Sequence, residues 1–185
     1  MRPALTIFAV ASAFGLAGCG SNSDNQSAPK SEAARDAAGD KTIASGLGDG
    51  DRKFADAAKA AGLDATLAGP GPYTVLVPTD AAFDKLPAGA LDTLMKAEAR
   101  PQLTKVLTGH ILPGAILTAD IAKAIDNSKG KATLATVGNG TLTATREGGK
   151  IVLSDAAGGK AVIGAADDKR SNGVVHHIDG VLMPS

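Results

Sequence analysis

Apolar residues along this chain follow two different periods, which divide the sequence into a helical half and a strand-rich half. Asp51 can cap a helix whose apolar residues recur at helical spacing, and Gly62 suits its end; the apolar residues are Phe54, Ala57, Ala58 and Ala61. From residue 131 onward, short stretches alternate apolar with small or polar residues. Helices first and antiparallel strands afterwards predict an α+β domain rather than a βαβ repeat.

Further elements follow from the same patterns. The stretch YTVLVP at 73–78 predicts a buried strand, and Thr79 can cap the turn DAAFDKLP that follows it. Helices are also predicted around Leu91, Leu94 and Met95, from Pro101 to Leu107, and over ADIAKAIDN, which Thr118 or Asp120 opens.

The second half predicts at least five closely spaced strands. KATLATV and TLTATRE are joined by Gly-Asn-Gly, which is typical of a hairpin turn. The remaining strands are predicted in GGKIVLSD, KAVIGAAD, NGVVHHID and VLMP, with residues 167–170 as a solvated loop before the last ones.

The N-terminus follows neither period. Arg2 precedes an apolar stretch at 4–16, which is too short for a spanning helix of about 20 residues and is typical of a secretory signal. Leu16-Ala17-Gly18-Cys19 resembles a bacterial lipobox and holds the only cysteine; the alternative is an ordinary signal with an incidental cysteine. The resemblance implies lipid on Cys19, and Gly20 in place of aspartate implies export to the outer membrane of a Gram-negative cell.

Residues 20–41 are polar, small and charged, and cannot bury enough surface to offset their ordering entropy. The predicted organisation is therefore a signal peptide at 1–18, lipidated Cys19 with a flexible tether at 19–41, and one domain at 42–185. The membrane is the partner predicted for the N-terminus, through the lipid on Cys19.

Composition narrows the classes of partner. The chain has 19 basic and 19 acidic residues, no tryptophan and one tyrosine. Nucleic-acid binding needs a clustered basic surface or exposed stacking aromatics, so we expect no nucleic-acid partner.

Three blocks, in order, resemble the fasciclin-like (FAS1) domain. They are YTVLVPTDAAFDKLP at 73–87, LTGHILPG at 107–114 and NGVVHHIDGVLMP at 172–184. The resemblance implies an antiparallel β-sandwich or wedge with helices packed around it, a role in adhesion or extracellular protein contacts, and no catalytic machinery. Gly109 stands where the central block usually has tyrosine, and His177 replaces a residue that is more often aliphatic in the terminal block.

The role of the two adjacent histidines, His176 and His177, decides whether the protein is an enzyme or a binding module. Side chains alternate faces along a strand, so His176 and His177 cannot bind one metal together, and no helix has a paired histidine spacing. We expect no metal or cofactor. His176 is predicted to be a buried imidazole hydrogen-bonded to Thr79 or Asp80, and His177 to be the more exposed of the two.

Two functions from different classes remain. The first is a lipid-anchored envelope module for adhesion, whose contacts are expected near His110, Ile111, Leu112, Ile116 and Leu117 and which should show a broad apolar patch. The alternative is a binding protein for a small or polymeric ligand, with a deep apolar pocket. Hydrolysis comes third, because the chain has no Gly-x-Ser-x-Gly elbow and its only cysteine is assigned to lipid.

Overall fold

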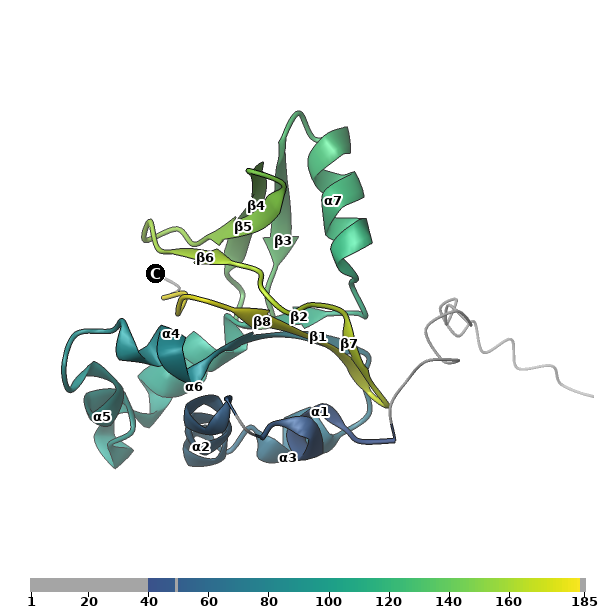
Figure 1. Ribbon diagram of the computed structural model, residues 1–185. Coiled ribbons are helices and arrows are strands. Elements are labelled where there is room, and N and C mark those ends of the chain that lie inside the picture. Colours follow the sequence, from purple (N-terminus) through teal and green to yellow (C-terminus); the bar gives the residue numbers. More distant parts are fainter. Residues whose placement is uncertain (1–39, 49, 184–185) are drawn as a thin grey trace, which may run out of the picture. The chain divides into compact units, whose positions relative to one another are not determined.

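The computed structural model describes residues 40–48 and 50–183, which belong to one compact unit (Figure 1). The predicted signal peptide, Cys19 and nearly all of the predicted tether lie outside the described residues. The helices are α1 (Ile43–Gly46), α2 (Arg52–Ala61), α3 (Asp64–Ala68), α4 (Asp80–Asp84), α5 (Ala90–Leu94), the 3₁₀ helix η2 (Ala97–Ala99), α6 (Arg100–Thr108) and α7 (Thr118–Asn127). The strands are β1 (Tyr73–Pro78), β2 (Ile111–Pro113), β3 (Lys131–Ala135), β4 (Thr141–Glu147), β5 (Lys150–Ser154), β6 (Lys160–Val162), β7 (Asp168–Arg170) and β8 (Gly173–Ile178).

These strands form two four-stranded sheets. The second sheet has the order β3-β4-β5-β6 and is antiparallel throughout, with the predicted hairpin between β3 and β4. The first has the order β2-β1-β8-β7, and its central pair β1 and β8 runs parallel, from Tyr73 opposite Gly173 to Pro78 opposite Ile178. The α+β class is thus confirmed, but the purely antiparallel arrangement is wrong for this pair. A parallel pair requires a long crossover, and here the crossover contains the whole second sheet.

Two hydrophobic clusters lie on opposite faces of the first sheet. Val75, Val77 and Val175 pack toward the helices, together with the face of α2 that the sequence predicted. Leu76 and Ile178 pack toward α7 and the second sheet. Figure 1 shows α1, α2 and α3 below the first sheet and the second sheet with α7 above it. Both clusters consist of residues between Ile43 and Leu182, so this part of the chain has the cores that an independent folding unit needs.

Two helix N-termini are capped by carboxylates from distant parts of the chain. Asp51 makes no side-chain capping bond to α2; Asp80 accepts the Lys53 backbone N–H instead, at 2.9 Å. Asp167 accepts the backbone N–H of Thr118 at the start of α7, at 2.8 Å. A carboxylate beside free N–H groups stabilises a helix start wherever it stands in the sequence.

Other local predictions hold more closely. Thr79 caps α4 by accepting the Ala82 N–H, and Gly62 ends α2 in the left-handed region, at φ 76°. Two strand assignments are wrong. Residues 181–183 of VLMP form no strand, whereas Asp168–Arg170, predicted as a loop, form β7 because β8 offers them a free edge.

Candidate functional site

His176 is completely buried in β8, facing the second sheet. Its Nδ1 accepts the Asp167 backbone N–H at 3.0 Å, so Nε2 carries the proton and donates to the Ile116 carbonyl at 2.8 Å. Burial lowers the pKa of His176, and this outweighs the opposing effects of the Ile116 hydrogen bond and the Asp167 charge. The side chain is a neutral cross-link between two loops.

The predicted partners of His176 are wrong. Thr79 caps α4, and the Asp80 carboxylate caps α2 on the helical side. Pro78 pairs with Ile178, so Thr79 and Asp80 lie beyond the position of His176 along the strands. The Asp80 carboxylate also lies on the opposite face of the sheet, where it accepts the Lys53 N–H. Burial and hydrogen bonding of His176 were predicted correctly; the groups that satisfy it come from segments without a recognisable pattern.

His177 faces the helices, as the alternation of a strand requires. Its side chain is 22% exposed, against 0% for His176, which confirms the predicted difference between the two. Its Nε2 donates to the Asp51 carboxylate at 2.9 Å, while its Nδ1 is buried without a partner. This contact joins β8 to the residue that precedes α2.

His110 lies between α6 and β2 and is 1% exposed. Its Nδ1 donates to the Val106 carbonyl at 2.8 Å and its Nε2 accepts the Leu182 N–H at 3.1 Å, so it holds the C-terminal segment. Burial lowers the pKa of His110 to about 4, against the Val106 hydrogen bond and the Asp155 charge. The two buried histidines therefore carry their protons on opposite ring nitrogens.

Three of the five residues predicted to form a contact surface around the central block are buried, namely His110, Ile111 and Leu112. Ile111 is 2% exposed and Leu112 is completely buried, because β2 sends one side chain into each cluster. With His110 they have no surface to offer a partner in this fold, so their predicted binding role is wrong. Ile116 and Leu117 are half-buried, and Val137 at 43% is the exposed large hydrophobic residue of the described chain. A broad apolar patch is therefore not found among these residues.

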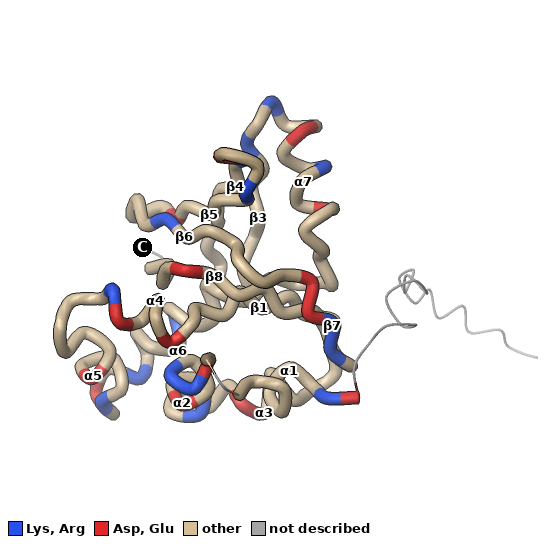
Figure 2. Tube along the Cα trace, in the orientation of Figure 1, with Lys and Arg blue, Asp and Glu red and all other residues tan. Residues whose placement is uncertain are grey.

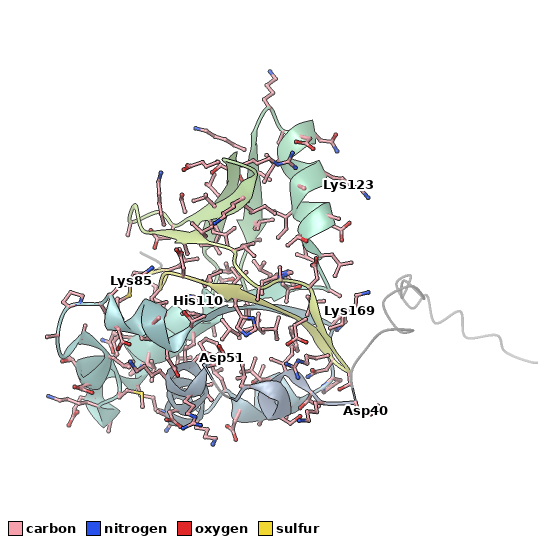
Figure 3. The ribbon with its side chains drawn as sticks, in the orientation of Figure 1. Asp40, Asp51, Lys85, His110, Lys123 and Lys169 are labelled. Carbon is pink, nitrogen blue, oxygen red and sulfur yellow. The ribbon has the colours of Figure 1, made fainter. Side chains whose placement is uncertain are left out.

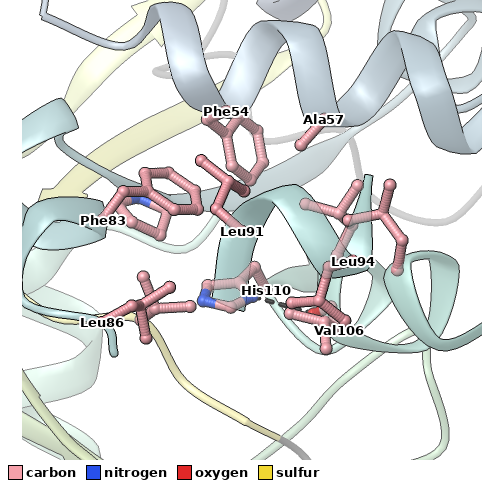
Figure 4. Close-up of a pocket in the computed structure, with 12 residues that line it drawn as sticks. Phe54, Ala57, Phe83, Leu86, Leu91, Leu94, Val106 and His110 are labelled. Atoms are coloured by element: carbon pink, nitrogen blue, oxygen red, sulfur yellow. Dashed lines mark hydrogen bonds between the residues drawn. The ribbon is translucent and has the colours of Figure 1, made fainter. Parts of the chain in front are cut away.

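A small apolar cavity lies under α5, between α2, α4 and α6 (Figure 4). The space inside it that the centre of a water-sized sphere can occupy is about 10 Å³. This is about the smallest volume that can hold one water molecule. The ring of His110 forms part of the wall, with its edge toward Phe54 at 6.5 Å between ring centroids. Both nitrogens of that ring are already bonded to backbone, so the cavity offers no free polar side-chain atom. Its lining residues are Phe54, Ala57, Pro78, Phe83, Leu86, Leu91, Leu94, Leu103, Val106, Leu107, His110 and Val181.

An open groove lies next to this cavity, between α4 and the second sheet. It has a volume of about 380 Å³ and a mixed polar and apolar lining. Two lysine–carboxylate pairs border it, Lys85 with Asp179 at 3.6 Å and Lys160 with Glu147 at 3.5 Å. The other residues that line it are Ala82, Leu86, Val152, Gly159, Val162, Gly180 and Val181.

Charge is spread over the described domain without a dominant sign. Basic and acidic positions are interspersed along the trace in Figure 2. Among residues 40–48 and 50–183, no three His, Cys, Asp or Glu side chains stand close enough together to hold a metal ion. Within the same residues, no helix combines the length and apolar character needed to cross a membrane.

Comparison with solved structures places the fold. The chain resembles the FAS1 domain pair of the insect cell adhesion molecule fasciclin I with a TM-score of 0.67 and 19% identity, over 76% of this chain and 50% of that one. This likeness concerns the fold alone.

Comparison with curated proteins gives closer sequence relatives. Protein sll1483 of Synechocystis is 37% identical over 128 residues, or 69% of this chain and 64% of that protein. The transforming growth factor-beta-induced protein ig-h3 of Sus scrofa is 33% identical over 129 residues, and immunogenic protein MPB70 of Mycobacterium bovis is 32% identical over 114. The chain spans only 17% of the pig protein and 51% of the mycobacterial one. The family model described as Fasciclin domain matches residues 50–184, and the chain therefore belongs to the fasciclin domain family.

Proposed function

We propose that this protein is a lipid-anchored module of the bacterial cell envelope that mediates adhesion or protein contacts through its fasciclin domain. The match of residues 50–184 to a family linked to adhesion carries this proposal. The lipobox-like Leu16-Ala17-Gly18-Cys19 supports the anchor, and the polar residues up to 41 would separate the domain from the membrane.

The character of the surface indicates how such contacts would work. Hot spots of protein interfaces are enriched in Trp, Tyr and Arg, and the chain has no tryptophan and one tyrosine, which is half-buried. One copy should therefore bind its partner weakly. Many anchored copies on one surface would hold firmly, because each bond raises the effective concentration of the next.

Adhesion is tested with beads that carry residues 40–185 at different densities. Adhesion to cells or envelope fragments should rise much more steeply than the number of domains on each bead. Albumin-coated beads serve as the control. If dense beads adhere no better than albumin beads while the free domain hydrolyses an ester or glycan panel, the protein is an enzyme and the proposal fails.

The anchor is tested separately on the full chain. Wild type should incorporate labelled fatty acid and fractionate with outer membranes, whereas Cys19→Ala should do neither. Unlabelled wild type that leaves the membrane fraction after export would rule out the lipid anchor and leave the adhesion test unaffected.

A further inference from the structure

The open groove and the apolar cavity share part of their walls. Leu86 and Val181 line both spaces, so these two half-buried side chains stand between them. The cavity on the inner side is apolar, while the groove on the outer side has charged residues along its border. The two spaces are therefore adjacent, and only these two side chains need to move apart to join them.

The outer wall of the cavity is the part least anchored to the domain. It consists of Leu86 together with Leu91 and Leu94 of α5, and none of the residues of α5 is fully buried. The inner wall, in contrast, is formed by buried residues such as Phe54 and Leu107. An outward movement of α5 and Leu86 would enlarge the cavity without disturbing this inner wall.

The two charged pairs at the groove differ in how firmly they are held. Lys85 donates to the Asp179 carbonyl at 2.6 Å, and the Asp179 carboxylate accepts the Val162 N–H at 2.7 Å. Lys160 and Glu147 meet only through one 3.5 Å contact, with side chains 64% and 57% exposed. Exposed pairs of this kind contribute little to stability. Lys160 can therefore exchange Glu147 for an anionic group of a ligand.

We propose that the groove and cavity bind a single acyl chain with an anionic head group. The head lies at Lys160, and the chain follows the apolar floor made by Val152 and Val162 before it passes between Leu86 and Val181. The groove volume of about 380 Å³ falls within the range of small-molecule sites, and the cavity adds room for the chain end once α5 moves. This role is independent of adhesion, so either can fail without the other.

The test is calorimetric titration of residues 40–185 with hexanoate, octanoate and decanoate below their micelle concentrations. Affinity should rise about fourfold per added methylene, as transfer of an alkyl chain from water predicts at roughly 0.8 kcal/mol each. Decanol should bind about tenfold more weakly than decanoate, because it lacks the charge that Lys160 recognises. Decanol binding as tightly as decanoate, or affinity independent of chain length, would overturn the proposal.

Matched charge reversals locate the head group. Lys160→Glu should weaken decanoate binding about tenfold, whereas Lys123→Glu on α7 should leave it unchanged. Both lysines are exposed, and Figure 3 shows Lys123 on α7, far from the Lys85 side of the groove. Equal affinities of the two variants would remove Lys160 from the site and overturn the proposal.

A cavity-filling variant locates the chain end. Ala57→Leu places a larger side chain into the cavity from α2, so the gain in affinity from octanoate to decanoate should shrink to less than twofold. Circular dichroism first establishes that the variant is folded. If it is not, the length series of wild type and the Lys160 pair decide the matter alone.

The source of the acyl chain is distinguished by a sedimentation experiment. Uptake of lysophosphatidate from phosphatidylglycerol vesicles would identify a membrane lipid as the ligand, and binding of monomeric decanoate alone would identify a free fatty acid. Failure of both would show that the groove has no acyl ligand.

Discussion

The face of the first sheet that meets the second sheet differs from the face that meets the helices in how it uses histidine. His176 faces the second sheet, is fully buried and satisfies two backbone groups from distant loops. His177 faces the helices, is partly exposed and meets one carboxylate, Asp51. His176 and His177 thus have unrelated structural roles, because successive side chains of a strand point to opposite faces of the sheet. Neither role requires catalysis.

The largest expected effect is acid destabilisation through His110. Its pKa is about 4 in the folded domain and 6.5 in the unfolded chain, so the unfolded state binds more protons between these values. The stability is complete above pH 6.5 and is lost as pH falls toward 4, by about 3 kcal/mol in total. Urea unfolding at a series of pH values measures this loss.

His110→Gln is the matched control for the acid effect. Glutamine has one donor and one acceptor group for Val106 and Leu182 but does not titrate. Its unfolding free energy should fall less steeply between pH 6.5 and 4 than that of wild type. Parallel curves for the two proteins would show that other groups, such as His176, account for the acid sensitivity.

His176→Ala should cost about 2–3 kcal/mol at pH 7. The substitution leaves the Asp167 N–H and the Ile116 carbonyl without their partner in a buried place. Denaturant unfolding of this variant beside His177→Ala tests the comparison of the two faces directly. Equal losses would mean that the opposed environments of the two histidines do not matter for stability.

The long-range cap should give an intermediate effect. Asp80→Ala removes the acceptor of the Lys53 N–H at the start of α2 and should cost about 1–2 kcal/mol. Thr79→Ala, which removes the local cap of α4, is the neighbouring control and should cost about 1 kcal/mol. If Asp80→Ala proves neutral in thermal and urea unfolding, solvent replaces the carboxylate at α2.

The smallest effect is expected on the helical face, from the pair of His177 and Asp51. A double-mutant cycle with His177→Ala and Asp51→Ala should give a coupling energy of about 0.5–1.5 kcal/mol, because the contact is charge-assisted but partly exposed. A coupling of zero would mean that the two side chains stabilise the domain independently.

Short-range sequence patterns predicted much of this fold, and the features that they missed have an identifiable physical cause. The apolar face of α2, the strand at Tyr73, the hairpin around Asn139 and the opposed faces of His176 and His177 follow from periods of a few residues. The caps from Asp80 and Asp167, the Leu182 contact of His110 and the parallel pairing of β1 with β8 join residues 27 to 100 positions apart. No local pattern encodes such partners, because any carboxylate or strand edge of suitable geometry can fill the role.

The same limit applies to the candidate site. The sequence placed the binding surface on aliphatic residues of the central block, but Ile111 and Leu112 are buried members of the two clusters. The groove at Lys85 and Lys160 had no sequence signal, since its walls come from α4, three strands and the segment after β8. Only the fold brings these segments together.

The position of β8 between β1 and β7 has a consequence for how the protein is made. Tyr73 cannot acquire its neighbour Gly173 until the ribosome has translated almost the whole chain, and that loop of about 100 residues must then close. A nascent chain therefore lacks the centre of its first sheet until β8 has been made. The closing of the domain is thus tied to the end of synthesis, which under the predicted export signal would leave time for a translocation channel to thread the chain.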